Sequence, residues 1–179
     1  MTYKLDQNDF LQHQLFLASK SERIKRQRTT TWLILSATLL FLSHLFYKSG
    51  DNVLFYYFLI SGILIFIFYP FYQRRHYKNH YNKFIADTYK NRFGQTANIK
   101  FTDSVIETTD ITGESKINLT ELENVTETGS YFFPKLKTGG HIIIPKAKID
   151  NVNELKNVLK QLCENLNIDF VEDLSWKWK

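Results

Sequence analysis

Two long uncharged segments, separated by a short break around Gly50, constrain this chain more than any other feature. Thr29 to Tyr47 is 19 residues without a charged side chain, and Asn52 to Gln73 is 22. A bilayer core needs about 20 apolar residues at 1.5 Å rise each, so both segments are long enough to span it. Apolar residues occupy every face of both segments, unlike a soluble amphipathic helix. The sequence therefore predicts an antiparallel transmembrane hairpin over residues 32–72.

The charges beside the hairpin predict its orientation. Nine basic residues flank it: Lys20, Arg23, Lys25, Arg26 and Arg28 before it, and Arg74, Arg75, Lys78 and Lys83 after it. The turn holds Lys48 alone, offset by Asp51. Short basic flanks stay in the cytoplasm, so we expect both termini inside, the turn outside, and the nine residues against anionic lipid. A cleaved signal peptide is disfavoured because the apolar region starts about 30 residues in and a second span follows.

The charge balance and the cysteine content limit the partners. The formal charge of +5 consists of +3 in residues 1–31, +5 in residues 71–95 and −3 in residues 96–179. The basic excess therefore lies at the membrane border, which argues against nucleic-acid binding. Cys163 is the only cysteine and cannot form an internal disulfide, which is consistent with a reducing compartment.

The segments beside the hairpin have helical patterns. We expect a helix over residues 6–28, with Asp6 as its cap and Asp9 near its N-terminus. An interfacial helix, or one packed on the soluble domain, is favoured there over a regulatory or partner-binding segment. A second helix is expected from Arg74 to Phe93, ending at Gly94. Pro70 is expected to kink the second span as it leaves the bilayer.

Three histidines are candidate functional residues. His44 lies about one turn from the outer end of the first span, and neither span holds another ionisable residue that would complete a proton relay. An interface residue is therefore favoured. His76 and His80 have the i, i+4 spacing of a metal pair, but no acidic or cysteine ligand stands beside them. We therefore expect no metal and no cofactor.

Beyond Gly94 the apolar period changes to two. Expected strands are Ala97 to Phe101, Val105 to Thr108, Ser115 to Leu119, Glu121 to Glu127, Ser130 to Leu136 and His141 to Pro145, with turns at Thr102-Asp103 and Asp110–Gly113. An amphipathic helix is expected over Val152 to Leu166, with Lys156 and Lys160 on its polar face and Val158 on its apolar face. The tail Phe170 to Lys179 suits an edge strand or a docking segment. These elements predict an α+β fold in which a small antiparallel, barrel-like sheet is closed by one helix.

The whole order resembles the YcxB-like family of bacterial membrane proteins. The resemblance rests on the lead DQNDFLQHQLFLASKSERIKRQR, the two spans, the basic helix, and the segments IKFTDSVIETTD, INLTELENVTETGSYFFPK and HIIIPKAKIDNVNELKNVLKQL. It implies a C-terminal domain similar to bacterial pleckstrin-homology (PH) folds and carries no catalytic residues. The predicted parts are a lead helix (1–31), the hairpin (32–72), a juxtamembrane helix (73–93) and a cytoplasmic PH-like domain (94–179).

No G-x-S-x-G, P-loop or H-E-x-x-H pattern occurs, so we do not expect an enzyme. The expected function is a membrane-anchored binding or scaffold protein that contacts membrane lipids and an unknown protein partner; a homo-oligomer is compatible with the sequence. The alternatives are a membrane-state sensor or regulator, and an accessory subunit of a membrane enzyme or transporter. Four lysines were singled out as a ligand patch of the domain: Lys135, Lys137, Lys146 and Lys148. A solvated loop is the simpler interpretation of these lysines.

Overall fold

The computed structural model describes residues 1–102, 104–111 and 113–179. Two long apolar helices and two four-stranded sheets make the chain α+β, as predicted. Its contacts define two compact units. The α+β unit contains residues 1–13 and 84–177, and the hairpin unit contains residues 14–83 together with Trp178 and Lys179.

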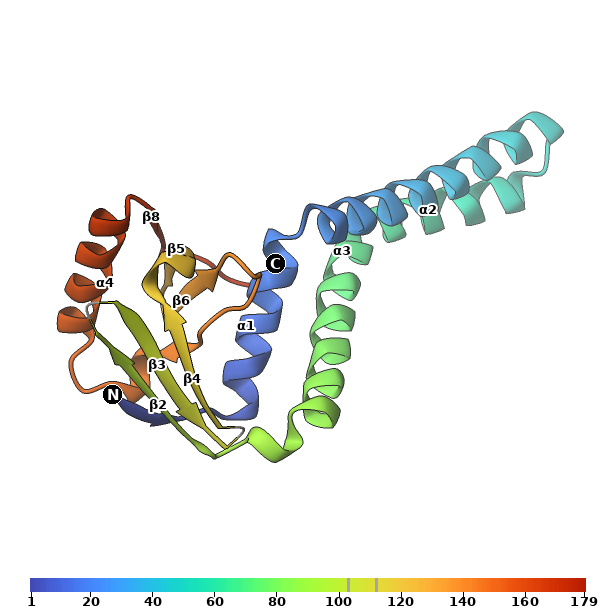
Figure 1. Ribbon diagram of the computed structural model, residues 1–179. Coiled ribbons are helices and arrows are strands. Elements are labelled where there is room, and N and C mark those ends of the chain that lie inside the picture. Colours follow the sequence, from blue (N-terminus) through green and yellow to red (C-terminus); the bar gives the residue numbers. More distant parts are fainter. Residues whose placement is uncertain (103, 112) are drawn as a thin grey trace. The chain divides into compact units, whose positions relative to one another are not determined.

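Helices α2 (Glu22–Ser49) and α3 (Asn52–Thr88) form the hairpin (Figure 1). Gly50 ends α2 in the left-handed conformation with φ 81°, which a residue without Cβ adopts at no steric cost. The two predicted helices after the turn are one continuous helix, α3, which runs to Thr88 and is followed by the short helix η1 (Lys90–Arg92). Figure 1 shows α3 bending beyond the part that runs beside α2. Pro70 lies inside α3, where its missing N–H weakens the helix.

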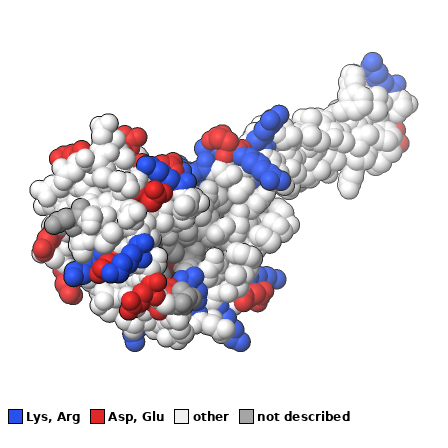
Figure 2. All heavy atoms as spheres, viewed as in Figure 1, with Lys and Arg blue, Asp and Glu red and all other residues white. Residues whose placement is uncertain are grey.

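Both helices are long and apolar enough to cross a membrane. Their most apolar stretches are only 11% and 6% buried, whereas a core helix of a soluble protein would be mostly buried. Large apolar side chains point outward; Phe41, Phe68 and Phe71 are 61%, 60% and 68% exposed. Figure 2 shows that the hairpin surface in view carries no charge between its two ends.

Helix α1 (Gln7–Lys20) begins with the predicted cap in a reciprocal form. The Asp6 carboxylate accepts from the Asp9 N–H at 3.1 Å, and the Asp9 carboxylate accepts from the Asp6 N–H at 2.8 Å. The prediction of one helix over residues 6–28 is wrong. Ser21 is extended, and its hydroxyl accepts from the Ile24 N–H at 3.4 Å, so it ends α1 and caps α2.

The predicted strands form two sheets and not one. The first, in the order β1-β2-β3-β4, is antiparallel and contains Thr2–Lys4, Thr96–Phe101, Val105–Asp110 and Gly113–Asn118. The second, in the order β7-β6-β5-β8, contains Ile144–Pro145, Tyr131–Leu136, Leu122–Thr128 and Asp169–Asp173, with β8 parallel to β5. The expectation of a closed barrel is therefore not met, because the 3₁₀ turn η2 (Leu119–Glu121) carries the chain from one sheet into the other. Two predicted turns each include a residue, Asp103 or Thr112, outside the described residues.

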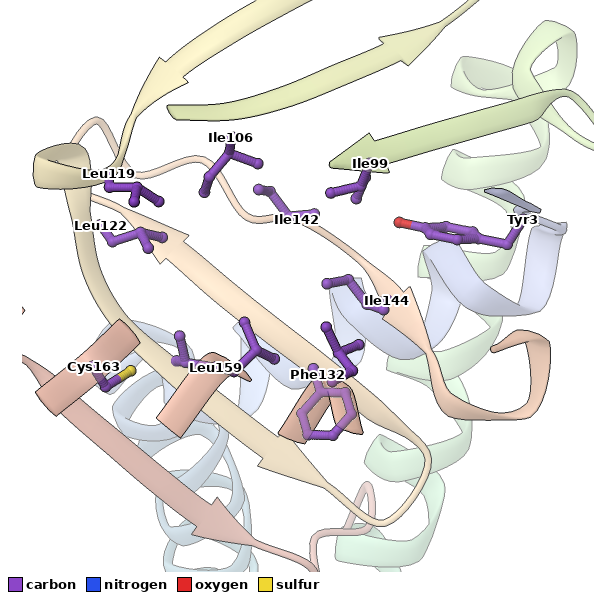
Figure 3. Close-up of a cluster of buried hydrophobic side chains, with 12 residues drawn as sticks. Tyr3, Ile99, Ile106, Leu119, Leu122, Phe132, Ile142, Ile144, Leu159 and Cys163 are labelled. Carbon is purple, nitrogen blue, oxygen red and sulfur yellow. The ribbon is translucent and has the colours of Figure 1, made fainter. Parts of the chain in front are cut away.

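The core of the α+β unit lies between the two sheets and helix α4 (Val152–Leu166), whose bounds match the prediction. Figure 3 shows Ile106 and Ile142 pointing into the same space as Leu119 and Leu122. Leu159 on α4 is fully buried, but its neighbour Val158, predicted on the same apolar face, is 39% exposed. One further short helix, η3 (Lys146–Lys148), precedes α4.

Candidate functional site

A groove of about 700 Å³ opens at the basic end of the hairpin unit. Helix α2 contributes Lys25, Arg28, Thr29 and Trp32, and α3 contributes Pro70, Phe71, Gln73 and Arg74; Lys179 also lines the groove. The four α2 residues follow the i, i+3, i+4, i+7 spacing, so one stripe of the helix faces the groove. Cations and apolar rings thus share one hollow.

Hydrogen bonds between α2 and α3 hold this groove in shape. Gln73 is 7% exposed and donates through Nε2 to the Arg28 carbonyl at 3.1 Å. The Trp32 indole donates to the Phe66 carbonyl at 3.0 Å, and the two rings stack with their centroids 4.9 Å apart. The apolar pattern of the sequence predicts neither hydrogen bond.

Trp178 packs into the same end of the hairpin unit. It is 7% exposed, and its indole donates to the Arg74 carbonyl at 3.0 Å. The Arg28 guanidinium lies 5.0 Å from its ring centroid and donates through Nη2 to the Lys179 carbonyl at 3.0 Å. The tail therefore divides: Asp169–Asp173 forms the edge strand β8, and Trp178 docks.

The nine predicted membrane-surface residues all belong to the hairpin unit, from Lys20 at the end of α1 to Lys83 on α3. The groove collects Lys25, Arg28 and Arg74. Arg23 and Arg26 line a separate shallow hollow of about 630 Å³ with Glu22, Gln27 and Thr30. The basic residues of α2 therefore lie on different faces of the helix.

The four patch lysines of the α+β unit lie at two ends of strand β6. Lys135 forms a backbone β-bridge with His141 at one end, and the backbone N–H of Lys146 donates to the Ser130 carbonyl at the other. Five residues of strand separate the two ends, which is about 15 Å. Three of the lysines have carboxylate partners: Lys135 with Glu123 at 2.5 Å, Lys146 with Glu127 at 2.6 Å, and Lys148 with Asp6 at 2.8 Å and Asp9. Lys137 is exposed.

Glu127 joins β5 to the helix α4. Its side chain is 4% exposed, and its carboxylate lies 2.6 Å from Lys146 Nζ and 2.7 Å from Lys156 Nζ. Burial raises the pKa of Glu127, but the hydrogen bonds from the two lysines outweigh it and hold the pKa below its ordinary value. Lys156 and Lys160 also pair with Glu172 on β8, so the predicted polar face of α4 forms ion pairs with the second sheet.

Asp9 is the second buried carboxylate of the α+β unit, 3% exposed. It accepts from the Tyr131 hydroxyl at 3.0 Å and from Lys148. Burial, followed by the charge of Asp9, raises the pKa of Tyr131. Burial opposes the charged form of Lys148, but hydrogen bonds to Asp6 and Asp9 prevail and raise its pKa. Lys148 therefore holds the start of α1 against η3.

A cavity of about 320 Å³ in the α+β unit contains two neighbouring histidines. The rings of His13 and His141 lie 5.2 Å apart, and His13 Nε2 and His141 Nδ1 are buried with no hydrogen-bond partner among the described residues. Burial, with His141 beside it, lowers the pKa of His13 to about 4, and burial also lowers the pKa of His141. Arg92 and Asp110, which also line this cavity, form an ion pair at 2.5 Å.

The described part of the chain holds no group of three or more metal-ligating side chains. His44, His76 and His80 are exposed, and the last two contact tyrosine rings of α3. The His13–His141 pair was missed by sequence reasoning, because 128 positions separate the two residues and no local spacing links them.

Comparisons with protein-family models, with curated proteins and with solved structures gave no match to this chain. Function is therefore argued from the residues of the chain itself.

Proposed function

We propose that this chain is a membrane-anchored binding protein. The observation that carries the proposal is the outward-facing apolar surface of α2 and α3, whose most apolar stretches are 11% and 6% buried. Outward phenylalanines and leucines are costly in water but favourable in a hydrocarbon core. The hairpin acts as the anchor, and the α+β unit acts as the module that contacts a partner.

The orientation proposed places the turn at Gly50 outside and both ends of the chain in the cytoplasm of a bacterial cell. Ten basic residues against two acidic ones in residues 14–83 support it, because all the basic ones except Lys48 lie away from the turn. Kinship with the YcxB-like family and a PH-like character of the α+β unit belong to the same proposal. The two sheets with one helix, α4, packed against the core are compatible with a PH-like fold that is open at its edges.

Binding is favoured over catalysis by how the charged groups of the α+β unit are used. Glu127 and Asp9, its buried carboxylates, each pair with lysines and connect secondary-structure elements. Such groups stabilise a surface and are not poised to transfer a proton. The accessory-subunit alternative stays a prediction, since it needs a complex that contains a catalytic chain.

Cysteine labelling of intact and lysed cells tests the anchor and its orientation. Cys163 is the only cysteine and is buried, and burial raises its pKa to about 11, so it gives a low labelling background. In a Cys163→Ser chain, Ser49→Cys should react with a membrane-impermeant maleimide in intact cells, whereas Ser175→Cys should react only after lysis. Extraction of the chain by alkaline carbonate would contradict the anchor, and the reverse labelling pattern would contradict the orientation alone.

A pH sensor, which differs from the membrane-state sensor expected from the sequence, is a second candidate, and one observation favours it: the His13–His141 pair. Two adjacent histidines with lowered pKa values repel each other when both are protonated, which couples the α+β unit to acidic pH. A pH-dependent change of this unit in the membrane-bound chain would support a sensor, and a pH-independent unit would leave binding as the function.

A further inference from the structure

The groove at the base of the hairpin has the chemistry of an anion site. Lys25, Arg28 and Arg74 line it, and Thr29 adds a hydroxyl donor. No Asp or Glu side chain lines the groove among the described residues, but Glu22, outside the lining, pairs with Lys25 at 2.6 Å. That pair is highly exposed, with side chains 50% and 85% accessible, and pairs of this kind are weak. An incoming anion can therefore replace Glu22 at Lys25.

Arg28 has unused hydrogen-bonding capacity at this site. A guanidinium carries five N–H donors. The structure gives Arg28 one hydrogen-bond acceptor, the Lys179 carbonyl, and within the described residues its Nε is buried without a partner. Trp178 lies 5.0 Å from the guanidinium and Tyr77 5.7 Å, so aromatic rings hold the side chain in place. A preorganised guanidinium of this kind suits the tetrahedral oxygens of a phosphate.

The other end of the groove is apolar. Trp32, Pro70 and Phe71 line it, and Phe71 is 68% exposed. Along α2, Trp32 is seven residues from Lys25, which is about 10 Å of helix. Leu33 and Ile34 continue the outward apolar surface toward the turn, at 48% and 62% exposed. The lining of the groove therefore changes from basic to apolar side chains over a distance similar to the length of one lipid headgroup and its glycerol.

We propose that this groove binds one anionic phospholipid, with its phosphate at Lys25, Arg28 and Arg74 and its acyl chains along Trp32 and Phe71. The inference rests on the proposed membrane anchor and names a ligand for it. Zwitterionic lipids are disfavoured because their ammonium group would meet four basic side chains, and no Asp or Glu side chain lines the groove in the described residues. A soluble phosphate ester is disfavoured because it leaves the apolar end of the groove unfilled.

The test compares two charge-matched double variants of the full chain in detergent. Arg28→Gln with Arg74→Gln removes two cations from the groove, and Arg23→Gln with Arg26→Gln removes two from the other face of α2. Native mass spectrometry counts bound phosphatidylglycerol against phosphatidylcholine. We expect tight binding of one phosphatidylglycerol, weakened tenfold or more by the groove variant and less than threefold by the control.

The outcomes separate the explanations. Equal weakening by the two variants would show diffuse attraction to a basic surface and overturn the site. Equal binding of the two lipids would overturn the anionic preference, and competition by soluble glycerol phosphate at the same concentration as the lipid would overturn the lipid as ligand. Because Arg28 also contacts Trp178, Lys25→Gln with Arg74→Gln repeats the test without disturbing that contact. Carbonate resistance measured on the same variants distinguishes loss of the anchor from loss of the lipid site.

Discussion

Large apolar side chains serve opposite purposes in the two units. Phe132 and Leu159 of the α+β unit are fully buried, whereas Phe68 and Phe71 of the hairpin unit are 60% and 68% exposed. The residue types are the same, but the run lengths differ: β6 has six residues, while the hairpin segments have 19 and 22 uncharged residues. A short run can be covered by its own domain, whereas a long run that is apolar on all faces is typical of a membrane-spanning helix.

Cations differ between the units in the same way. In the α+β unit Lys146, Lys148 and Lys156 each reach a buried carboxylate, Glu127 or Asp9. The hairpin unit has eleven basic residues and only two acidic side chains, so most of its cations have no Asp or Glu to pair with inside the unit. Charges therefore hold the fold of one unit, whereas the cations of the other unit greatly outnumber its acidic side chains.

The largest expected effect tests the burial of apolar side chains in the α+β unit. Leu159→Asp places an unpaired charge in the core, so we expect a loss of about 4 kcal/mol or more in the free energy of unfolding of the α+β unit. Val158→Asp, one residue away and 39% exposed, is the matched control and should cost less than about 1 kcal/mol. Urea unfolding of the full chain in mild detergent, followed by hydrogen exchange of α4, measures both. Similar losses for the two variants would mean that α4 does not bury the face described.

The next largest effect tests the buried ion pairs of the α+β unit. Glu127→Gln leaves Lys146 and Lys156 without their shared buried carboxylate, and we expect a loss of about 2 kcal/mol. Glu123→Gln, which breaks the more exposed pair with Lys135, should cost less than about 1 kcal/mol. The same unfolding assay applies. A Glu127 variant as stable as the Glu123 variant would refute the structural role of the buried pair.

The pH dependence of the Glu127 contribution has a definite sign. Because the pKa of Glu127 is lower in the folded state, its stabilisation is present above the ordinary glutamate pKa. It is lost as the pH falls through the lowered value. The difference between the parent chain and Glu127→Gln should therefore shrink in acid and stay constant near neutral pH.

Much of the fold was predictable from periodicity and caps. Helix α4 begins and ends as expected, since Asn151 caps it and the left-handed Asn167 stops it. The capping role of Asp6 followed from its place before an apolar run. The break at Ser21 was missed, because the helical pattern continues on both sides of it. The division into two sheets was also missed, since alternation identifies strands but not their partners.

The groove was only partly predictable. Its cations were identified as membrane-border residues, but charge counting does not assign Arg28 and Arg23 to different faces of α2. That assignment needs the partner helix, which supplies Gln73 and Arg74. The positions of His13, Asp9 and Glu127 depend on contacts between distant segments, so no local sequence pattern would have identified them.

A smaller effect concerns the two histidines. Since burial lowers the pKa of His13 to about 4, the unfolded chain binds more protons than the folded one between that value and the ordinary 6.5. Stability of the α+β unit should therefore fall by about 1–2 kcal/mol from pH 7 to pH 5. His13→Phe should flatten this slope, while His76→Phe, on an exposed part of α3, should leave it unchanged. Equal slopes in all three proteins would exclude a contribution from His13.

The smallest expected effect, that of Gly62→Ala, tests the contact between α2 and α3. A Cβ added to Gly62 would lie 2.9 Å from Leu40 Cδ2, closer than side chains normally approach. Leu40 is 40% exposed, so the tip of its side chain has room to move aside. Alanine also favours a helix over glycine by about 1 kcal/mol, which offsets the contact, and Gly62→Ala should change hairpin stability by less than about 0.5 kcal/mol. Gly62→Leu has no such room and should cost about 1–3 kcal/mol. Thermal unfolding in detergent, followed by circular dichroism, measures both; a leucine variant as stable as the alanine variant would mean that the two helices do not approach closely at Gly62.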